Sequence, residues 1–235
     1  MTSISDPTIH DQSSGHDPTI TDPTITRGEP MSNTTTNEND ILTDTSAGAV
    51  GFDGEIGPSM SEFSGEYMSY VEGHLDEDLR RVPERMMGLL RSMDDLHQGF
   101  AVSQLQHSLQ TATRAERDGA DDDMVIASLC HDIGKTFSNM NHPAIAAEML
   151  RPWVSDAAYW VVKYHQDFQG RHYYARIGID PEIRRKHLGH EHYELAERFA
   201  DVWDQTAFDP DYDTEPLEHF EPLVREVFSR TPRRG

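Results

Sequence analysis

The stretch that decides the fold is VIASLCHDIGK, residues 125–135, in which an apolar run ends in His131 and Asp132. Asp121–Asp123 come just before the run and favour a helix start, because carboxylates complement the helix dipole. Adjacent residues of an intact helix point about 100° apart, so these two side chains can face one metal ion only where the helix ends. Gly134 would permit that end. The stretch therefore predicts a buried helix that presents a nitrogen donor and a carboxylate at its C-terminus.

Helical spacing of apolar residues continues on both sides of this stretch. Upstream it predicts helices within 67–90, with Pro83 near a helix start or a kink, and over 101–118, with Gly119 as a stop. Downstream it predicts helices over 141–150, 155–164, 190–205 and 216–229, and a polar, aromatic loop over 166–180. Strand-like alternation is almost absent. The expected fold class is all-α.

The first part of the chain has a different composition. It contains three copies of Asp-Pro-Thr-Ile, at residues 6–9, 17–20 and 22–25. Acidic residues are frequent there and apolar residues are few, too few to offset the entropy of ordering the chain. We therefore expect a disordered acidic tail over 1–60 and one helical domain over 61–235.

The charge of the whole chain limits its partners. Asp and Glu number 42 against 20 Lys and Arg, a net charge of −22. Such a chain repels nucleic acid and anionic lipid, so neither is expected as a partner. The partner that we expect is a small-molecule substrate. No apolar run is long enough for a membrane span and no secretory signal is evident, so we expect a cytoplasmic protein. The oligomeric state is not indicated.

Cys130 is the single cysteine, which excludes an internal disulfide framework and a thiolate-rich zinc site. A buried core thiol is preferred to a redox group. Taken singly, His107, His142 and His165 would each be a core or surface imidazole. Their order at the ends of successive helical hairpins, around His131, instead predicts one shared metal site.

The ordered motif His107…His131-Asp132…His142…His165…Asp204 resembles the HD-domain superfamily of metal-dependent phosphohydrolases and oxygenases. Residues 104–112 (QLQHSLQTA), 141–147 (NHPAIAA) and Trp203-Asp204 are similar to one branch of it. That branch contains 2-amino-1-hydroxyethylphosphonate dioxygenase and, more distantly, myo-inositol oxygenase. The similarity covers about residues 97–210 and implies an HD-domain helical bundle.

The resemblance also implies two metal ions. The first would be bound by His107, His131, Asp132 and Asp204, and the second by Asp132, His142 and His165. Asp132 would bridge them and, with Lys135, serve in catalysis. In the oxygenase branch both metals are iron, whereas manganese or another divalent metal would serve a hydrolase. Asp201, one turn before Asp204, is the rival ligand.

The chain departs from the phosphonate dioxygenase at three places. His97 and Phe100 stand where that enzyme has a Tyr-x-x-Glu pair, Gln169 replaces a lysine, and Asp201 replaces an arginine. These departures imply a different substrate. The sequence does not choose among three candidates for binding an anion: Arg171, Arg151 and Lys135.

Three functions follow from these patterns. The preferred one is a mixed-valent di-iron oxygenase that cleaves a small polar substrate carrying vicinal oxygen or nitrogen donors. The alternative is a phosphohydrolase acting on a nucleotide or another phosphate ester. A non-catalytic HD module that senses a ligand is the third, and the intact ligand set argues against it.

Other polar and aromatic groups have simpler interpretations. Phe168, Tyr173 and Tyr174 either wall a pocket near the metals or pack between helices. Structural or solvated roles are expected for the histidines at 187, 190 and 192. The acid-rich segment 208–213 lacks the glycine and closing glutamate of a calcium loop, so a capped turn is expected.

Overall fold

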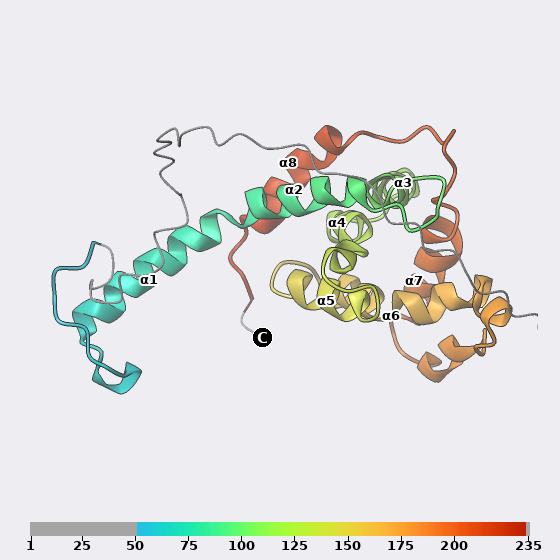
Figure 1. Ribbon diagram of the computed structural model, residues 1–235. Coiled ribbons are helices and arrows are strands. Elements are labelled where there is room, and N and C mark those ends of the chain that lie inside the picture. The colour runs from blue at the N-terminus through green and yellow to red at the C-terminus, as the bar shows by residue number, and fades with distance from the viewer. Residues whose placement is uncertain (1–50, 234–235) are drawn as a thin grey trace, which may run out of the picture. The chain divides into compact units, whose positions relative to one another are not determined.

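Every regular element of residues 51–233, which the structure describes, is a helix in this computed structural model (Figure 1). The predicted all-α fold class is confirmed. Residues 1–50, most of the predicted tail, lie outside the described residues, so the tail and its boundary with the domain stay predictions. Within the described part, Phe52 contacts the rings of Tyr67 and Tyr70 at centroid distances of 5.1 and 5.3 Å.

The first helices are α1 (Gly65–Arg80) and α2 (Val82–Ser92), after a 3-10 turn at Met60–Glu62. Pro83 lies in the first turn of α2, as predicted, where its missing N–H costs no helical hydrogen bond. No residue of α1 is buried, whereas α2 buries an apolar stripe against the core. A second 3-10 turn, Met93–Asp95, follows.

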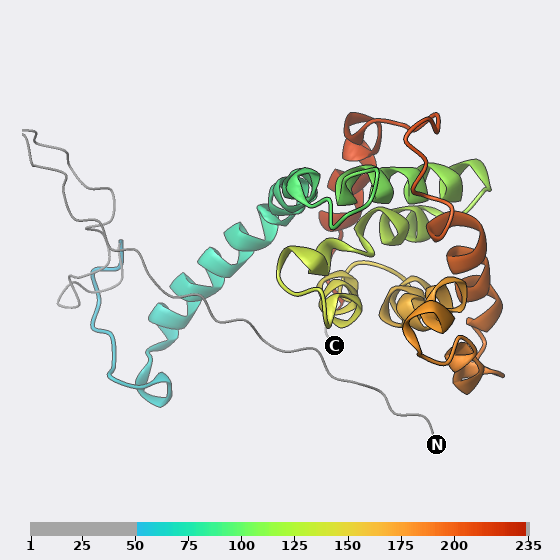
Figure 2. The ribbon, with the colours of Figure 1, turned by 45° about the vertical axis from the view of Figure 1, so that its right-hand side comes forward.

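The centre of the domain is the pair α3 (Gln104–Arg117) and α4 (Asp122–Cys130) (Figure 2). Gly119 joins the two with a φ of +79°, a left-handed conformation that favours glycine, so its predicted role as a helix stop is confirmed. Every residue of α4 from Met124 onward is buried, because α3, α6 and α8 surround it. A helix that is enclosed on all sides needs the unbroken apolar run seen in the sequence.

The start of α4 is fixed by Asp121, whose side chain accepts a hydrogen bond from Met124 N at 2.8 Å. Asp121→Ala removes this cap and is expected to lower the free energy of unfolding by about 1 kcal/mol. Urea denaturation followed by circular dichroism measures the change. Asp121→Asn keeps an acceptor oxygen and should remain close to wild type; an equal loss in both variants would contradict the capping role.

The next pair is α5 (His142–Leu150) and α6 (Asp156–Gln169). Ser155 caps α6, accepting from Ala158 N at 3.2 Å. The predicted helix end at 164 and loop over 166–180 are wrong. His165 and Phe168 continue the buried stripe of α6, so the helix runs on to Gln169, and two 3-10 helices follow, Gly170–His172 and Tyr174–Ile177.

The last segments pack on α2, α3, α4 and α6 and complete the domain. A 3-10 helix, Ile183–His187, leads to α7 (Tyr193–Arg198), which passes without a break into a π-helix, Phe199–Asp204. The predicted single α-helix over 190–205 is therefore wrong in its start and in its final turn. The last helix, α8 (Leu217–Phe228), packs on α2 and α4 (Figure 1).

Candidate metal centre

The α3–α4 hairpin brings together the first two predicted ligands. His107 projects from α3 and His131 follows the last residue of α4, and both side chains are fully buried. Their Nε2 atoms lie 3.1 Å apart. The short connection between the helices produces this contact, as the sequence predicts.

Asp132 faces both halves of the cluster. Its Oδ2 is 3.5 Å from His107 Nε2 and 3.4 Å from His131 Nε2. Its Oδ1 is 3.1 Å from His142 Nε2 and 3.6 Å from His165 Nε2. Because α4 ends at Cys130, consecutive residues can turn toward one centre. One carboxylate with an oxygen toward each pair of imidazoles has the placement of a bridging ligand.

Asp204, rather than Asp201, lies in the cluster. Its Oδ1 is 3.1 Å from His107 Nε2, and the side chain is fully buried. Asp201 instead accepts hydrogen bonds from His172 and Arg184.

The π-helix explains this difference. On an α-helix, residues three apart share a face. Here Gln205 N donates to Ala200 O, five residues back, at 3.1 Å. The wider π-helical turn directs the side chains of Asp201 and Asp204 toward different neighbours. Short π-helical turns are frequent at functional sites.

Each imidazole of the cluster is fixed at its Nδ1 atom by a backbone carbonyl. The acceptors for His107, His131, His142 and His165 are Ala207 O at 3.0 Å, Ser128 O at 2.8 Å, Asn139 O at 2.9 Å and Val162 O at 2.6 Å. A carbonyl can only accept, so Nδ1 carries the proton and each neutral ring has a bare Nε2. Bare Nε2 atoms nevertheless face each other at 3.1 and 3.3 Å. The lone pairs of two bare nitrogen atoms repel each other at these distances. Positive charge between the two atoms would stabilise the arrangement.

Two carboxylate oxygens of the cluster also lack a partner that would stabilise their negative charge. Asp132 Oδ1 and Asp204 Oδ2 are buried and accept no hydrogen bond. A buried charge without a partner costs free energy, which a bound cation would remove. The donor set therefore fits metal ions.

The electrostatics of the cluster favour a cation as well. Burial opposes charge on His131, but the carboxylates of Asp132 and Asp204 outweigh it and raise the His131 pKa to about 10. Burial also opposes charge on Asp132, yet His131 and Lys135 hold its pKa well below the usual range. At His165 burial dominates and lowers the pKa. Burial opposes charge on Asp204 too, but His131 and His107 lower its pKa, so both carboxylates stay ionised.

Gly134 allows a close approach of two backbone segments. It lies in the 3-10 helix Ile133–Thr136 and its φ is not positive, so the predicted role in ending the helix is wrong. A Cβ atom at this position would lie 2.3 Å from His142 O and 2.8 Å from His142 Cα. The missing side chain therefore lets the start of α5 reach the cluster.

Polar side chains hold the carboxylates from outside. Lys135 Nζ donates to Asp132 Oδ2 at 2.6 Å and to Gln104 Oε1 at 2.9 Å. Gln169 Nε2 donates to Asp204 Oδ1 at 2.9 Å. Such partners orient ligands and strengthen metal binding.

A cleft of about 750 Å³ opens beside the cluster. Lys135, His142 and Gln169 are among its lining residues. The cleft therefore reaches the cluster at His142, whose Nε2 faces that of His165. Among the described residues no aspartate or glutamate lines it, although the chain is strongly acidic. The other lining residues are mostly amides, aromatics and bases: Gln98, Phe100, Asn139, Gln166, His172, Tyr173, Arg176, Gln205 and Phe208. The volume suits a small molecule.

The aromatic residues expected near the metals divide between two roles. Tyr173 lines the cleft, whereas Phe168 is fully buried and packs against Trp160 and Tyr193. Tyr174 is also buried. Of the three candidates for anion binding, only Lys135 lines the cleft.

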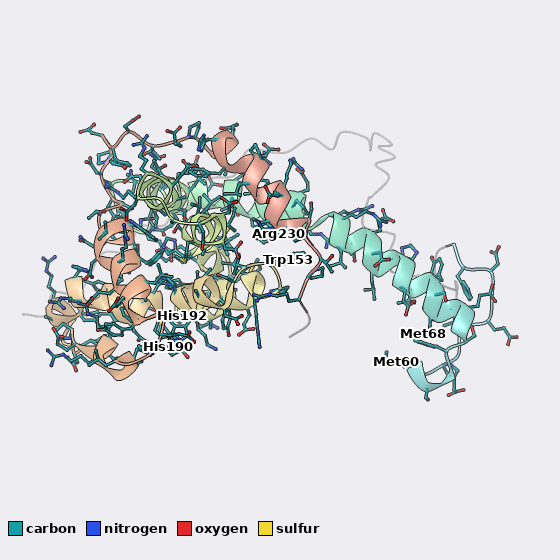
Figure 3. All side chains as sticks on the ribbon, turned by 180° about the vertical axis from the view of Figure 1, so that it is seen from behind. Met60, Met68, Trp153, His190, His192 and Arg230 are labelled. Carbon is teal, nitrogen blue, oxygen red and sulfur yellow. The ribbon has the colours of Figure 1, made fainter. Side chains whose placement is uncertain are left out.

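The remaining groups singled out in the sequence have structural roles. His190 stacks on Trp160 at 4.1 Å, and Figure 3 shows it beside His192 at the surface. His187 pairs with Asp167 at 2.9 Å. Burial raises the pKa of Cys130 to about 12, as expected of a core thiol. The segment 208–213 forms the predicted turn, in which Asp211 N donates to Asp209 Oδ1.

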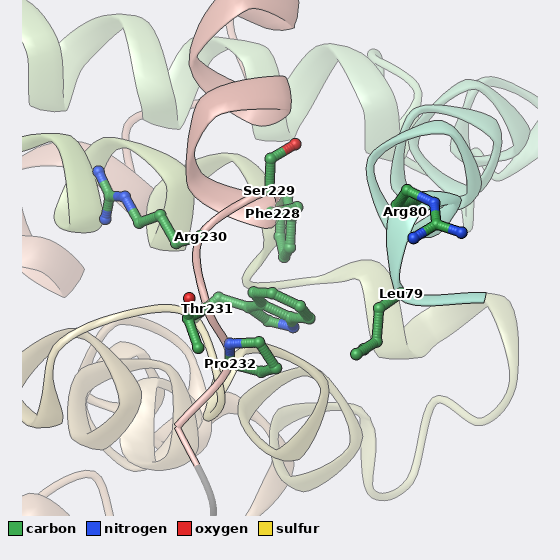
Figure 4. Close-up of a pocket in the computed structure, with 8 residues that line it drawn as sticks. Leu79, Arg80, Phe228, Ser229, Arg230, Thr231 and Pro232 are labelled. Carbon is green, nitrogen blue, oxygen red and sulfur yellow. The ribbon is translucent and has the colours of Figure 1, made fainter. Parts of the chain in front are cut away.

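A second cavity, of about 540 Å³, contains none of the predicted ligands. Figure 4 shows Leu79 and Pro232 on its walls, with the Arg230 side chain directed away. Arg230 is engaged by Asp123 at 2.6 Å. This cavity has no group that resembles the metal centre.

Sequence reasoning missed two residues next to the cluster. Gln104 lies one helical turn before His107, and Phe208 stacks on the His107 ring at a centroid distance of 4.2 Å. Gln104 could have been identified from the sequence by its position, one helical turn before a predicted ligand. It also missed His172 and Arg176 in the cleft, because no periodic pattern marks the 3-10 helices that carry them.

Residues 105–209 match the family model described as HD domain. A search of curated proteins found no match to the chain. No helix of the described residues is long and apolar enough to cross a membrane. The matched region includes every residue of the buried cluster.

Proposed function

We propose that the protein is a dinuclear metalloenzyme. The supporting observation is the two facing pairs of Nε2 atoms, 3.1 and 3.3 Å apart, in rings whose Nδ1 atoms are fixed by carbonyls. One metal ion would be held by His107, His131, Asp132 and Asp204, and the other by Asp132, His142 and His165. Two cations about 3.5–4 Å apart can share one carboxylate and orient one substrate.

The two halves differ in their number of donors. The first has four protein ligands, whereas the second has three, and His142 of the second half lines the cleft. Catalytic metal sites keep positions free of protein ligands for substrate or water. The substrate would therefore bind from the cleft at the second half, beside Lys135.

The proposed reaction is oxidative cleavage of a small polar substrate with vicinal oxygen or nitrogen donors, with dioxygen as co-substrate. Four imidazoles and two carboxylates without thiolate suit iron. Iron would supply the redox chemistry. The chain itself would position the substrate through the amides of the cleft, and Lys135 would hold the Asp132 carboxylate through its 2.6 Å hydrogen bond.

The alternative is a metal-dependent phosphohydrolase acting on a nucleotide or another phosphate ester. It is supported by Lys135 and Arg176, two cationic side chains in a cleft without carboxylates. Arginine and lysine bind phosphate groups well. The HD-domain superfamily, which the motif of this chain resembles, includes both phosphohydrolases and oxygenases.

Metal analysis and two assays separate the reactions. Protein purified without oxygen is examined by elemental analysis and low-temperature EPR, and oxygen uptake is measured with a panel of 1,2-diols and vicinal amino alcohols. A mixed-valent di-iron signal with substrate-dependent oxygen uptake supports the oxygenase. Turnover of bis(p-nitrophenyl) phosphate by manganese-loaded protein, without oxygen uptake, would support the hydrolase instead.

The two nearby aspartates provide a test of the first metal position. Asp204→Ala should lose metal, whereas Asp201→Ala should keep the full content, because only Asp204 Oδ1 lies near His107 Nε2. Plasma mass spectrometry after dialysis measures the content. The opposite order, with metal lost only from Asp201→Ala, would reject the assignment.

A further inference from the structure

We propose that His172 is a catalytic residue of the cleft, which exchanges a proton with the substrate, and that Asp201 and Arg184 are its positioning residues. This inference rests on the proposed function, because the substrate is taken to bind in the same cleft. His172 lines that cleft, and its Nε2 donates to Asp201 Oδ1 at 2.8 Å.

The orientation of His172 is opposite to that of the four cluster imidazoles. Those rings donate from Nδ1 to carbonyls and direct Nε2 at the metal centre. In His172 the Nε2–H group donates to the carboxylate of Asp201, so the neutral ring has a bare Nδ1. This atom has no hydrogen-bond partner among residues 51–233, and 31% of the side chain is exposed. Its free nitrogen is thus available to a molecule in the cleft.

Asp201 is itself held in place. Arg184 Nη1 lies 3.0 and 3.1 Å from the two oxygens of Asp201, and Arg184 is 2% exposed. Its Nη2 contacts Glu197 Oε1 at 3.0 Å. A buried guanidinium fixes the carboxylate, and the carboxylate fixes the ring. The π-helix that keeps Asp201 away from the metals places it at this position.

The arrangement provides a defined proton transfer. A substrate hydroxyl or ammonium group gives its proton to Nδ1 of His172, and the oxygen or nitrogen keeps the electron pair of the broken bond. The resulting imidazolium keeps its Nε2–H bond to Asp201, which stabilises the charge. Return of the proton from Nδ1 to the product restores the ring. A substrate with vicinal donors needs such a base, since deprotonated oxygen binds a cation more strongly.

The test uses two variants and a matched control. His172→Gln can still donate to Asp201 but cannot exchange a proton, and Asp201→Asn keeps its shape without charge. The control is His219→Gln, because His219 forms a comparable pair with Glu116 at 2.9 Å but lies outside the cleft. Iron-loaded proteins are assayed by oxygen uptake with the panel compound that wild type consumes fastest; manganese-loaded proteins are assayed with bis(p-nitrophenyl) phosphate.

A proton-transfer role predicts that His172→Gln lowers kcat by about 100-fold or more in the assay that wild type supports. KM, metal content and melting temperature should stay near wild type, and His219→Gln should be unaffected. Unchanged kcat in His172→Gln with wild-type metal content would overturn the proposal and leave the metal centre intact. Wild-type protein that binds no metal would instead reject the proposed function.

A second measurement does not depend on the substrate. In zinc-loaded, full-length protein labelled with 15N-histidine, the neutral ring of His172 should carry its proton on Nε2, and Asp201→Asn should change its nitrogen shifts. A proton on Nδ1 of the neutral ring, or no response to Asp201→Asn, would overturn the proposal even if no panel compound is consumed.

Discussion

Asp132→Ala is expected to release both metal ions and to abolish turnover. One carboxylate lies between the two pairs of imidazoles, with an oxygen 3.4 Å from His131 Nε2 and the other 3.1 Å from His142 Nε2. Its loss removes a ligand from each half and one of the two carboxylate charges that offset the cations. Since losing only an outer partner of a ligand already costs 10–100-fold, we expect metal affinity to fall by more than about 100-fold.

The measurement is metal content after dialysis, together with helical circular dichroism. The helical signal should persist, because the core of α4 lies in Met124–Cys130 and is not altered. Asp201→Ala is the matched control, as it removes a carboxylate that contacts His172 instead of the cluster. Two metal ions retained by Asp132→Ala would exclude a bridging role.

The fold was predictable wherever one apolar pattern decided the outcome. The run before His131 predicts a buried helix, and α4 is enclosed by three other helices. The end of α6 was not predictable, because His165 and Gln169 are polar and resemble the start of a loop. Phe168 extends the buried stripe of α6. Its ring packs against Trp160, two turns earlier in the same helix, and against Tyr193 of α7.

The site was predictable as a set of residues but not in its geometry. The order of the histidines along successive hairpins was enough to expect their convergence. The choice between Asp201 and Asp204 depends on a π-helical turn, whose five-residue hydrogen bond leaves no mark in the spacing of apolar residues. The cleft residues come from α-helices, 3-10 helices and turns of different segments, so no local pattern connects them.

The role of Gly134 was also hidden, because it depends on a segment eight residues further along the chain. Local reasoning assigned the glycine to the end of α4. The structure instead places its Cα against the backbone of His142, where a Cβ would lie 2.3 Å from a carbonyl oxygen. A methyl group at this position cannot be accommodated by a side-chain rotation, since the contact is with backbone.

Gly134→Ala is therefore expected to lose one metal ion and keep the other. The added methyl pushes the start of α5 away and withdraws His142 from Asp132 Oδ1, now 3.1 Å distant. His107, His131 and Asp204 do not depend on α5, so the first metal position should survive. Overpacking of this kind costs about 1–3 kcal/mol, and we expect the free energy of unfolding to fall within that range.

Metal content near one ion per chain, with turnover lost, is the expected outcome of Gly134→Ala. Gly88→Ala is the matched control, because Gly88 lies in α2 with nothing within 4 Å of its added Cβ, and alanine favours a helix by roughly 0.5–1 kcal/mol. Retention of two ions in Gly134→Ala would show that α5 can shift without moving its histidine. Loss of both ions would show that the first position depends on the second, and the two halves would then have to be treated as one cooperative site.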